Sequence, residues 1–176
     1  KTTLVRLILG LLPRSEGGGM VSFQGRPIEE WDMASYRERI AWINQVSPRF
    51  QLSAGENIGV GDAEQFSNQE MWFRAAGLGG ASEAIEALPM GYDTLLEGLS
   101  MGSNFGNAHS SGLSEGEWQS LILSRFFMRA DVARLLVLDE PFACQHPAVA
   151  RRMMSMLGTQ ARATGQASIW GGLWRS

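Results

Sequence analysis

The chain has 176 residues, of which 44% are hydrophobic and 19% charged, with a formal net charge of -3. This length suits one domain with a buried core, and the composition argues against a disordered chain. The acidic balance argues against a nucleic-acid-binding surface. The single cysteine, Cys144, cannot form an internal disulfide, which favours a reducing compartment. No apolar run approaches the roughly 20 residues of a membrane helix, so any membrane-spanning segment would have to come from elsewhere.

Local patterns predict helices that alternate with strands. We expect helices over residues 2–12, 36–39 and 148–164, strands over 20–23, 40–43, 134–138 and 167–170, and turns over 15–19 and 24–27. Residues 57–128 have a mostly helical pattern with glycine breaks at 77–80 and 98–112. The uninterrupted apolar run at 135–138 is typical of a strand buried on both faces. This alternation predicts a parallel sheet with helices packed on it.

Two acidic residues, Asp139 and Glu140, follow the buried strand at its carboxyl end. Ligands of α/β proteins bind at this edge of the sheet. Asp139 is therefore a candidate Mg²⁺ ligand, directly or through water, and Glu140 a candidate base that orients and deprotonates an attacking water. The alternative is a strand that runs into a solvated acidic turn.

The chain begins with Lys1, Thr2 and Thr3 in front of a predicted helix. In a phosphate-binding loop a lysine neutralises the β and γ phosphates, the next hydroxyl ligates Mg²⁺, and the helix N-terminus faces the anion. The glycines expected before Lys1 are not in the sequence. The assignment of Lys1, Thr2 and Thr3 to a phosphate-binding loop therefore depends on the motifs that follow. A start in mid-motif, and a stop soon after an apolar stretch, lead us to expect a fragment cut at both ends.

Four motifs follow one another in a characteristic order. They are Lys1-Thr2-Thr3, Gln45, Leu113-Ser114-Glu115-Gly116-Glu117 and Leu138-Asp139-Glu140-Pro141. This order resembles the ATPase of ABC transporters over nearly the whole chain. Other segments resemble the exporter type, whose membrane helices usually precede the ATPase in the same polypeptide: Phe50-Gln51-Leu52, Glu56-Asn57-Ile58, Leu88-Pro89, Gly91-Tyr92-Asp93-Thr94, Trp118-Gln119 and Ser124-Arg125.

The resemblance implies an α/β fold of the P-loop NTPase type, with a mostly parallel sheet, flanking helices and an inserted helical subdomain. Residues 1–45 and 130–176 would form the RecA-like core, and about 46–129 the helical subdomain. The implied cofactors are ATP and Mg²⁺. Lys1, Thr2 and Thr3 would bind the nucleotide, Thr2, Gln45 and Asp139 the metal ion, and Glu140 and Gln45 would act in catalysis.

The resemblance also implies partners. Two such domains face each other head to tail, so Ser114 and Gly116 of one would contact the γ-phosphate of ATP held by the other. The segment 46–52 would contact a transmembrane domain and pass on the closure of the dimer. This places the chain at the cytoplasmic face of the plasma (inner) membrane, with no nucleic-acid partner.

The chain departs from the family pattern at three places. The signature motif is Leu-Ser-Glu-Gly-Glu, where the family favours Leu-Ser-Gly-Gly-Gln; Ser114 and Glu117 also fit a capping box. A carboxylate held roughly 7 Å from the phosphate repels it by about 2 kcal/mol, so closure is weakened unless Glu115 and Glu117 can turn outward. His146 replaces the usual aspartate, and no histidine follows the last predicted strand.

Three functions stay open at this point. The leading hypothesis is ATP hydrolysis that drives export, and Glu140 favours it. The main alternative is a degenerate, catalytically weak cassette that binds ATP and regulates a partner, which His146, the missing histidine and the acidic signature favour. A soluble ABC-type ATPase of DNA repair or translation is disfavoured by the exporter-like segments at 50–58 and 91–94. The two histidines, His109 and His146, form no metal cluster with the acids.

Overall fold

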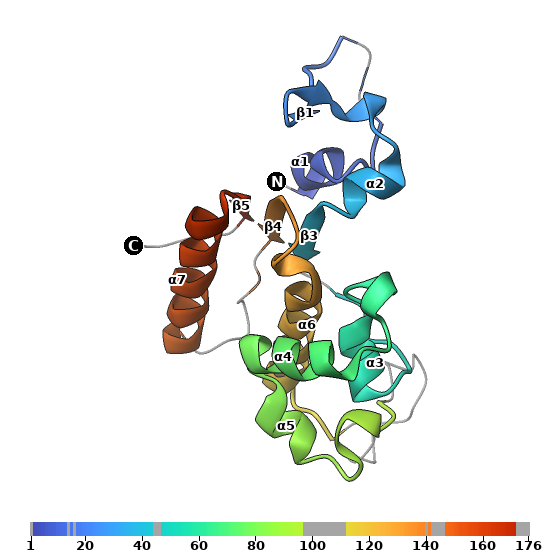
Figure 1. Cartoon of the computed structure of the whole chain (residues 1–176), viewed down its shortest axis with the longest axis vertical. Coiled ribbons are helices and arrows are strands. Elements are labelled where there is room, and N and C mark those ends of the chain that lie inside the picture. Colours follow the sequence, from blue (N-terminus) through green and yellow to red (C-terminus); the bar gives the residue numbers. More distant parts are fainter. Residues whose placement is uncertain are drawn as a thin grey trace.

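The structure is a computed structural model, and it describes residues 2–13, 15, 17–43, 47–96, 112–139, 141 and 147–171. Figure 1 shows the arrangement of the elements. The α-helices are α1 (Thr2–Ile8), α2 (Met33–Arg37), α3 (Ala54–Gly59), α4 (Gln69–Gly79), α5 (Ser82–Glu86), α6 (Glu115–Ala130) and α7 (Pro147–Thr164). The strands are β1 (Ser22–Phe23), β2 (Arg26–Pro27), β3 (Ile40–Ile43), β4 (Leu135–Asp139) and β5 (Ala167–Gly171). Short 3-10 helices are η1 (Ile28–Glu30), η2 (Ala63–Gln65) and η3 (Gly91–Asp93).

Three parallel strands form the central sheet in the order β3-β4-β5. The register pairs Ile40 with Leu135 and Leu138 with Trp170. All five residues of β4 are buried, as expected for a central strand covered on both faces. The predicted parallel sheet is therefore confirmed, and β3, β4 and β5 lie within one residue of their predicted positions.

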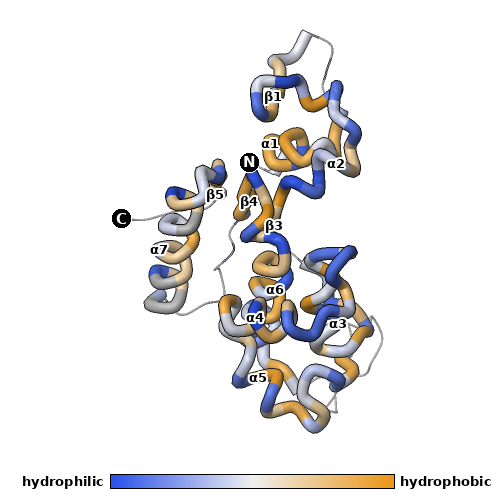
Figure 2. The backbone as a smooth tube through the Cα atoms, viewed as in Figure 1, coloured by the Kyte–Doolittle hydropathy of each residue, from blue (hydrophilic) through white to orange (hydrophobic). Residues whose placement is uncertain are grey.

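Two hydrophobic clusters cover the two faces of this sheet. Alternate residues of β4 enter different clusters, because side chains alternate across a strand: Leu135 and Val137 pack with α1, β1 and α2, whereas Leu136 and Leu138 pack with α3, α4, α6 and α7. Figure 2 shows hydrophobic residues along β4 and on the neighbouring α1. Within the described residues, no helix is long and apolar enough to cross a membrane.

The N-terminal region differs from the sequence expectation in its boundaries. Residues 26–27, predicted as a turn, form β2 and pair antiparallel with β1. Gln24 and Gly25, with φ of 52° and 78°, make the connection, because positive φ at both central residues suits a two-residue hairpin loop. Helix α1 is shorter than expected: Gly10 lies after it with φ 63°, a conformation that ends helices. Helix α2 begins three residues earlier than predicted because the Asp32 carboxylate caps it, accepting from Ser35 N at 2.9 Å.

The prediction of a helix break at 77–80 is wrong for residues 77–79, which belong to α4. The helix ends at Gly80, which has φ 76°. Gly79 instead permits the close packing of α4 on α6. A Cβ at this position would lie 2.2 Å from Ser124 Oγ and 2.6 Å from Ser124 N. Most of the second predicted break, at 98–112, lies outside the described residues.

We therefore expect Gly79→Ala to destabilise the protein by about 1–3 kcal/mol, because α4 and α6 must move apart. Gly77→Ala is the matched control, since a Cβ there meets only Ser82 Oγ, at 3.9 Å. Gly77→Ala should raise the free energy of unfolding by roughly 0.5–1 kcal/mol, because alanine has a higher helix propensity than glycine. Urea unfolding measures both changes, and equal effects of the two substitutions would contradict this packing argument.

Candidate functional site

The structure describes some of the predicted site residues and not others. Lys1, Gln45 and Glu140 lie outside the described residues, so their roles stay predictions. Thr2 and Thr3 begin α1 and are exposed. Val5 of α1 and Leu9, directly after the helix, belong to the same buried cluster as Val137 of β4.

Asp139 is the last residue of β4 and is 8% exposed. It pairs with Gly171, the last residue of β5. A Cβ on Gly171 would lie 2.5 Å from Asp139 Oδ1, so the carboxylate occupies space that only a glycine leaves free. Asp139 thus presents a buried carboxylate at the carboxyl edge of a parallel sheet, where such sheets bind ligands.

This donor chemistry fits Mg²⁺, which takes one or two protein carboxylates and completes its shell with water and phosphate oxygens. Across the described part of the chain, no group of three or more His, Cys, Asp or Glu residues could hold a metal ion. At this site the described residues therefore offer Mg²⁺ a single carboxylate, that of Asp139. Such a site would be completed by the oxygens of a phosphate ligand.

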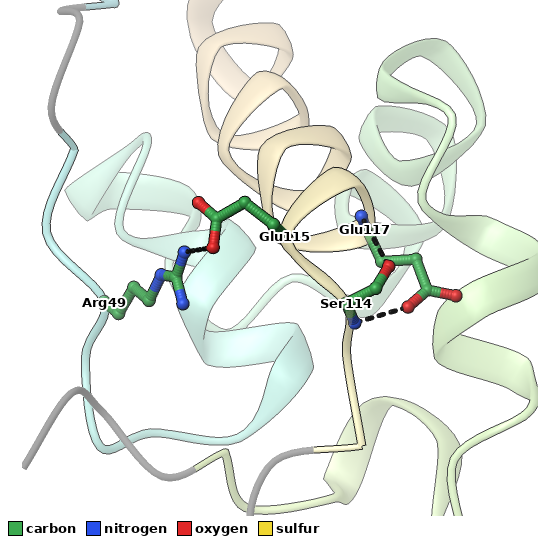
Figure 3. A network of polar contacts seen from close by, with 4 residues as sticks. All are labelled: Arg49, Ser114, Glu115 and Glu117. Carbon is green, nitrogen blue, oxygen red and sulfur yellow. Dashed lines mark hydrogen bonds and ion pairs between the residues drawn. The ribbon is translucent and has the colours of Figure 1, made fainter. Parts of the chain in front are cut away.

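The signature motif surrounds the N-terminus of α6, and its capping box is confirmed. Ser114 Oγ accepts a hydrogen bond from Glu117 N at 3.4 Å, and Ser114 N donates to Glu117 Oε2 at 2.6 Å (Figure 3). The Ser114 side chain and the Ser114 N–H, both hydrogen-bonded to the Glu117 carboxylate, lower the pKa of Glu117. A Cβ on Gly116 would meet no atom within 4 Å, so the space beside this residue is open.

The two acids of the signature point in different directions in Figure 3. Glu117 folds back onto its own helix N-terminus, whereas Glu115 pairs with Arg49, whose Nη2 donates to Glu115 Oε2. The Arg49 guanidinium also lies 5.1 Å from the centre of the Trp118 ring. Both carboxylates therefore have local partners, which bears directly on the repulsion expected from the sequence.

Sequence reasoning missed the role of Arg125. This arginine is 8% exposed and donates to Asn57 O at 2.6 Å, Asn57 Oδ1 at 2.6 Å and Pro48 O at 2.5 Å. Burial lowers its pKa to about 10, so it stays protonated at neutral pH. The sequence offers Ser124-Arg125 only as a pair that resembles the family pattern, because the partners of Arg125 lie 68 and 77 residues away.

Asn57 organises the segment that precedes α3. Its Nδ2 donates to the carbonyl oxygens of Phe50 and Leu52, each at 3.1 Å. Its side chain is fully buried, which explains the need for an amide at this position. Arg125 and Asn57 together attach residues 48–52 to α6 and α3.

Helix α6 also contacts the segment that follows Asp139, because Gln119 Nε2 donates to Pro141 O at 2.7 Å. A cleft of about 410 Å³ lies on another side of α6. Its apolar lining includes Trp42 of β3, Phe50, Val60 and Phe126. The cleft thus connects the sheet, the segment 47–50 and α6.

One chain does not bring all candidate residues together. Helix α1 packs beside the strands on one face of the sheet, whereas α6 packs on the other face and its N-terminus lies among α3, α4 and α5, away from the sheet (Figure 1). Thr2 and Thr3 begin α1, and Ser114 and Gly116 belong to the start of α6, so the two pairs lie on elements that pack on different faces of the sheet.

The capping box generates a stability prediction. Ser114→Ala removes the hydroxyl that caps α6 and should lower the free energy of unfolding by about 1 kcal/mol, whereas Ser155→Ala, at an exposed position within α7, should not lower it.

Glu117→Gln should lower the free energy of unfolding by about 0.3–1 kcal/mol at neutral pH. Because the folded pKa of Glu117 is lowered from 4.5, its contribution is complete above this value and is lost as the pH falls through the folded pKa. Urea unfolding at several pH values checks this; a Glu117→Gln cost that does not shrink in acid would contradict it.

Comparisons with known proteins identify the family. The family model described as ABC transporter matches residues 1–143. The glutathione/L-cysteine transport system ATP-binding/permease protein CydD of Haemophilus influenzae is 31% identical over 143 residues, which cover 81% of this chain and 21% of that protein. The ATP-dependent lipid A-core flippase of Legionella pneumophila is 31% identical over 140 residues, which cover 80% of this chain and 21% of that protein.

A solved structure shows the same fold. The structure of a bacterial Atm1-family ABC exporter with ATP bound matches with a TM-score of 0.75 and 23% identity, over 99% of this chain and 27% of that chain. The chain thus spans about a fifth to a quarter of the length of these proteins. Together with the matched motifs, these findings show that the chain belongs to the ABC transporter family.

Proposed function

We propose that the chain is the nucleotide-binding domain of an exporter, which binds ATP with Mg²⁺ and hydrolyses it to drive transport. The observation that carries this proposal is the buried Asp139 carboxylate at the carboxyl edge of the parallel sheet. Family membership supports the coarser statement, since ABC transporters are ATPases. The exporter assignment draws on the names of relatives that combine ATP-binding and permease functions.

Asp139 and Thr2 would hold Mg²⁺ together with Gln45, and the ion would neutralise charge on the β and γ phosphates. Lys1 and Thr3 would bind the same phosphates. Glu140 follows Asp139 directly, so it would stand next to the reacting phosphate. It would orient the attacking water and accept its proton, with Gln45 as a second contact to that water.

The positions of α1 and α6 in the chain support a site divided between two copies. Because α1 and α6 pack on opposite faces of the sheet, and the N-terminus of α6 lies among α3, α4 and α5 (Figure 1), we expect one ATP to contact only one of the two within a single chain. We propose that a second copy, oriented head to tail, places its Ser114 and Gly116 against the γ-phosphate. A helix N-terminus suits this role because its free N–H groups face the anion.

We further propose that about 46–129 form an inserted helical subdomain, with 1–45 and 130–176 as the RecA-like core. The distribution of the elements supports this division. All strands of the described chain lie outside 46–129, whereas α3, α4, α5 and most of α6 lie within it.

A transmembrane domain is the proposed partner for the segment 46–52 and the adjoining cleft of about 410 Å³. The cleft supports this because its apolar lining suits a protein segment inserted from outside, and because Arg125 holds its rim at Pro48. The chain would then work at the cytoplasmic face of the plasma membrane.

The alternative of a degenerate cassette that regulates a partner gains nothing from the comparisons. Its main arguments were His146 and the missing histidine after β5, and both concern segments outside the described residues. Its third argument, the acidic signature, is weakened because Glu115 and Glu117 both have local partners.

The catalytic proposal is tested by Glu140→Gln in the intact protein. Loss of the general base should lower Mg²⁺-dependent ATP turnover by at least about 100-fold, while binding of ATP persists. Glu38→Gln, at an exposed position after α2, is the matched control and should leave turnover unchanged. Wild-type turnover no faster than that of Glu140→Gln would contradict the proposal.

A further inference from the structure

Arg49 lies where the segment after residue 46 meets the N-terminus of α6. Its side chain is only 18% exposed, whereas its partner Glu115 is 68% exposed. The guanidinium has two attachments, the Glu115 carboxylate and the face of Trp118. Trp118 is itself almost fully buried, so it provides a fixed platform for the cation.

The backbone on both sides of Arg49 is also held in place. Arg125 Nη1 donates to Pro48 O at 2.5 Å, and the Arg125 guanidinium lies 4.9 Å from the centre of the Phe50 ring. Arg49 therefore reaches Glu115 from a segment whose neighbouring residues are both held, Pro48 through its carbonyl oxygen and Phe50 through its ring.

Glu115 would oppose an anionic ligand if it stood alone. It is the first residue of α6 and lies between Ser114 and Gly116, the residues that would meet a phosphate. Because the Glu115 side chain is 68% exposed, solvent screens this repulsion more strongly than the effective dielectric constant of about 20 that underlies the value expected from the sequence. At roughly 7 Å and an effective dielectric constant of about 80 to 40, a free carboxylate weakens phosphate binding about three- to eightfold. A bound guanidinium removes most of this repulsion because it cancels the charge.

We propose that Arg49 is a positioning residue, which holds Glu115 to one side of the α6 N-terminus and neutralises it, so that an acidic signature accepts the phosphate of ATP. This inference rests on the proposed function. It assigns to Arg49 a role that the residues of the signature cannot perform themselves, since Leu113–Glu117 contain no basic side chain.

A double-mutant cycle in the intact protein tests the proposal. The variants are Arg49→Met, which keeps an unbranched side chain over Trp118 without its charge, Glu115→Gln, and the double variant. The measurement is the MgATP concentration that gives half-maximal association of two labelled copies, followed by energy transfer between the labels. Urea unfolding of every variant establishes that it is folded.

Arg49→Met should raise the half-maximal MgATP concentration about three- to eightfold, because Glu115 is left unpaired. In the Glu115→Gln background the same substitution should have less than about a twofold effect. Arg74→Met is the matched control: it removes the same charge from an arginine paired with Asp131 and should shift nothing.

Two results would overturn the inference. An equal effect of Arg49→Met in both backgrounds would mean that Arg49 acts through packing on Trp118, and no effect in either would mean that Glu115 does not influence the phosphate. If the wild-type protein shows no association with MgATP, the proposed function itself fails, and the inference fails with it. Association of the wild type without coupling between residues 49 and 115 overturns the inference alone.

Discussion

The burial of helix α6 is the constraint on which the rest of the structure depends. Eleven of its sixteen residues are buried, and it contacts α3, α4 and β3. Its last turn leads directly into β4 and Asp139, and its first turn carries the signature. Because Gly79 packs directly on Ser124 and Arg125 binds Asn57, a displacement of α6 would disturb the helical region and the sheet together. One helix thus connects the two places where ATP chemistry is proposed.

Sequence reasoning succeeded where the physical cause is local. The apolar run of β4 predicted a buried strand, and Ser114 with Glu117 predicted a capping box, since both patterns operate within a few residues. It failed where the cause is a tertiary contact. Gly79 is needed because Ser124 lies against it, and Arg49 finds Glu115 66 residues later in the chain. No local sequence pattern predicts such a distant partner. The sequence therefore overestimates the repulsion between the acids of the signature and a phosphate.

The carboxyl edge of the sheet and the N-terminus of α6 have different chemical tasks. The sheet edge contributes the Asp139 carboxylate, which suits a cation, whereas the N-terminus of α6 contributes N–H groups, which suit an anion. ATP with Mg²⁺ presents both charges. In a single copy, α1 and α6 pack on opposite faces of the sheet, and we propose that a second copy completes each site. Association and nucleotide binding are then two aspects of one event.

Complementation between two damaged copies tests this claim most directly. Asp139→Asn damages the sheet edge, and Ser114→Arg blocks the signature; each variant alone should lose Mg²⁺-dependent ATP turnover. When the two are co-expressed in the intact protein, a mixed head-to-tail dimer contains one site built from the undamaged halves, and random pairing should restore about a quarter of the wild-type sites. We expect turnover to reappear in the mixture. A mixture as inactive as its components would contradict a site shared between two copies.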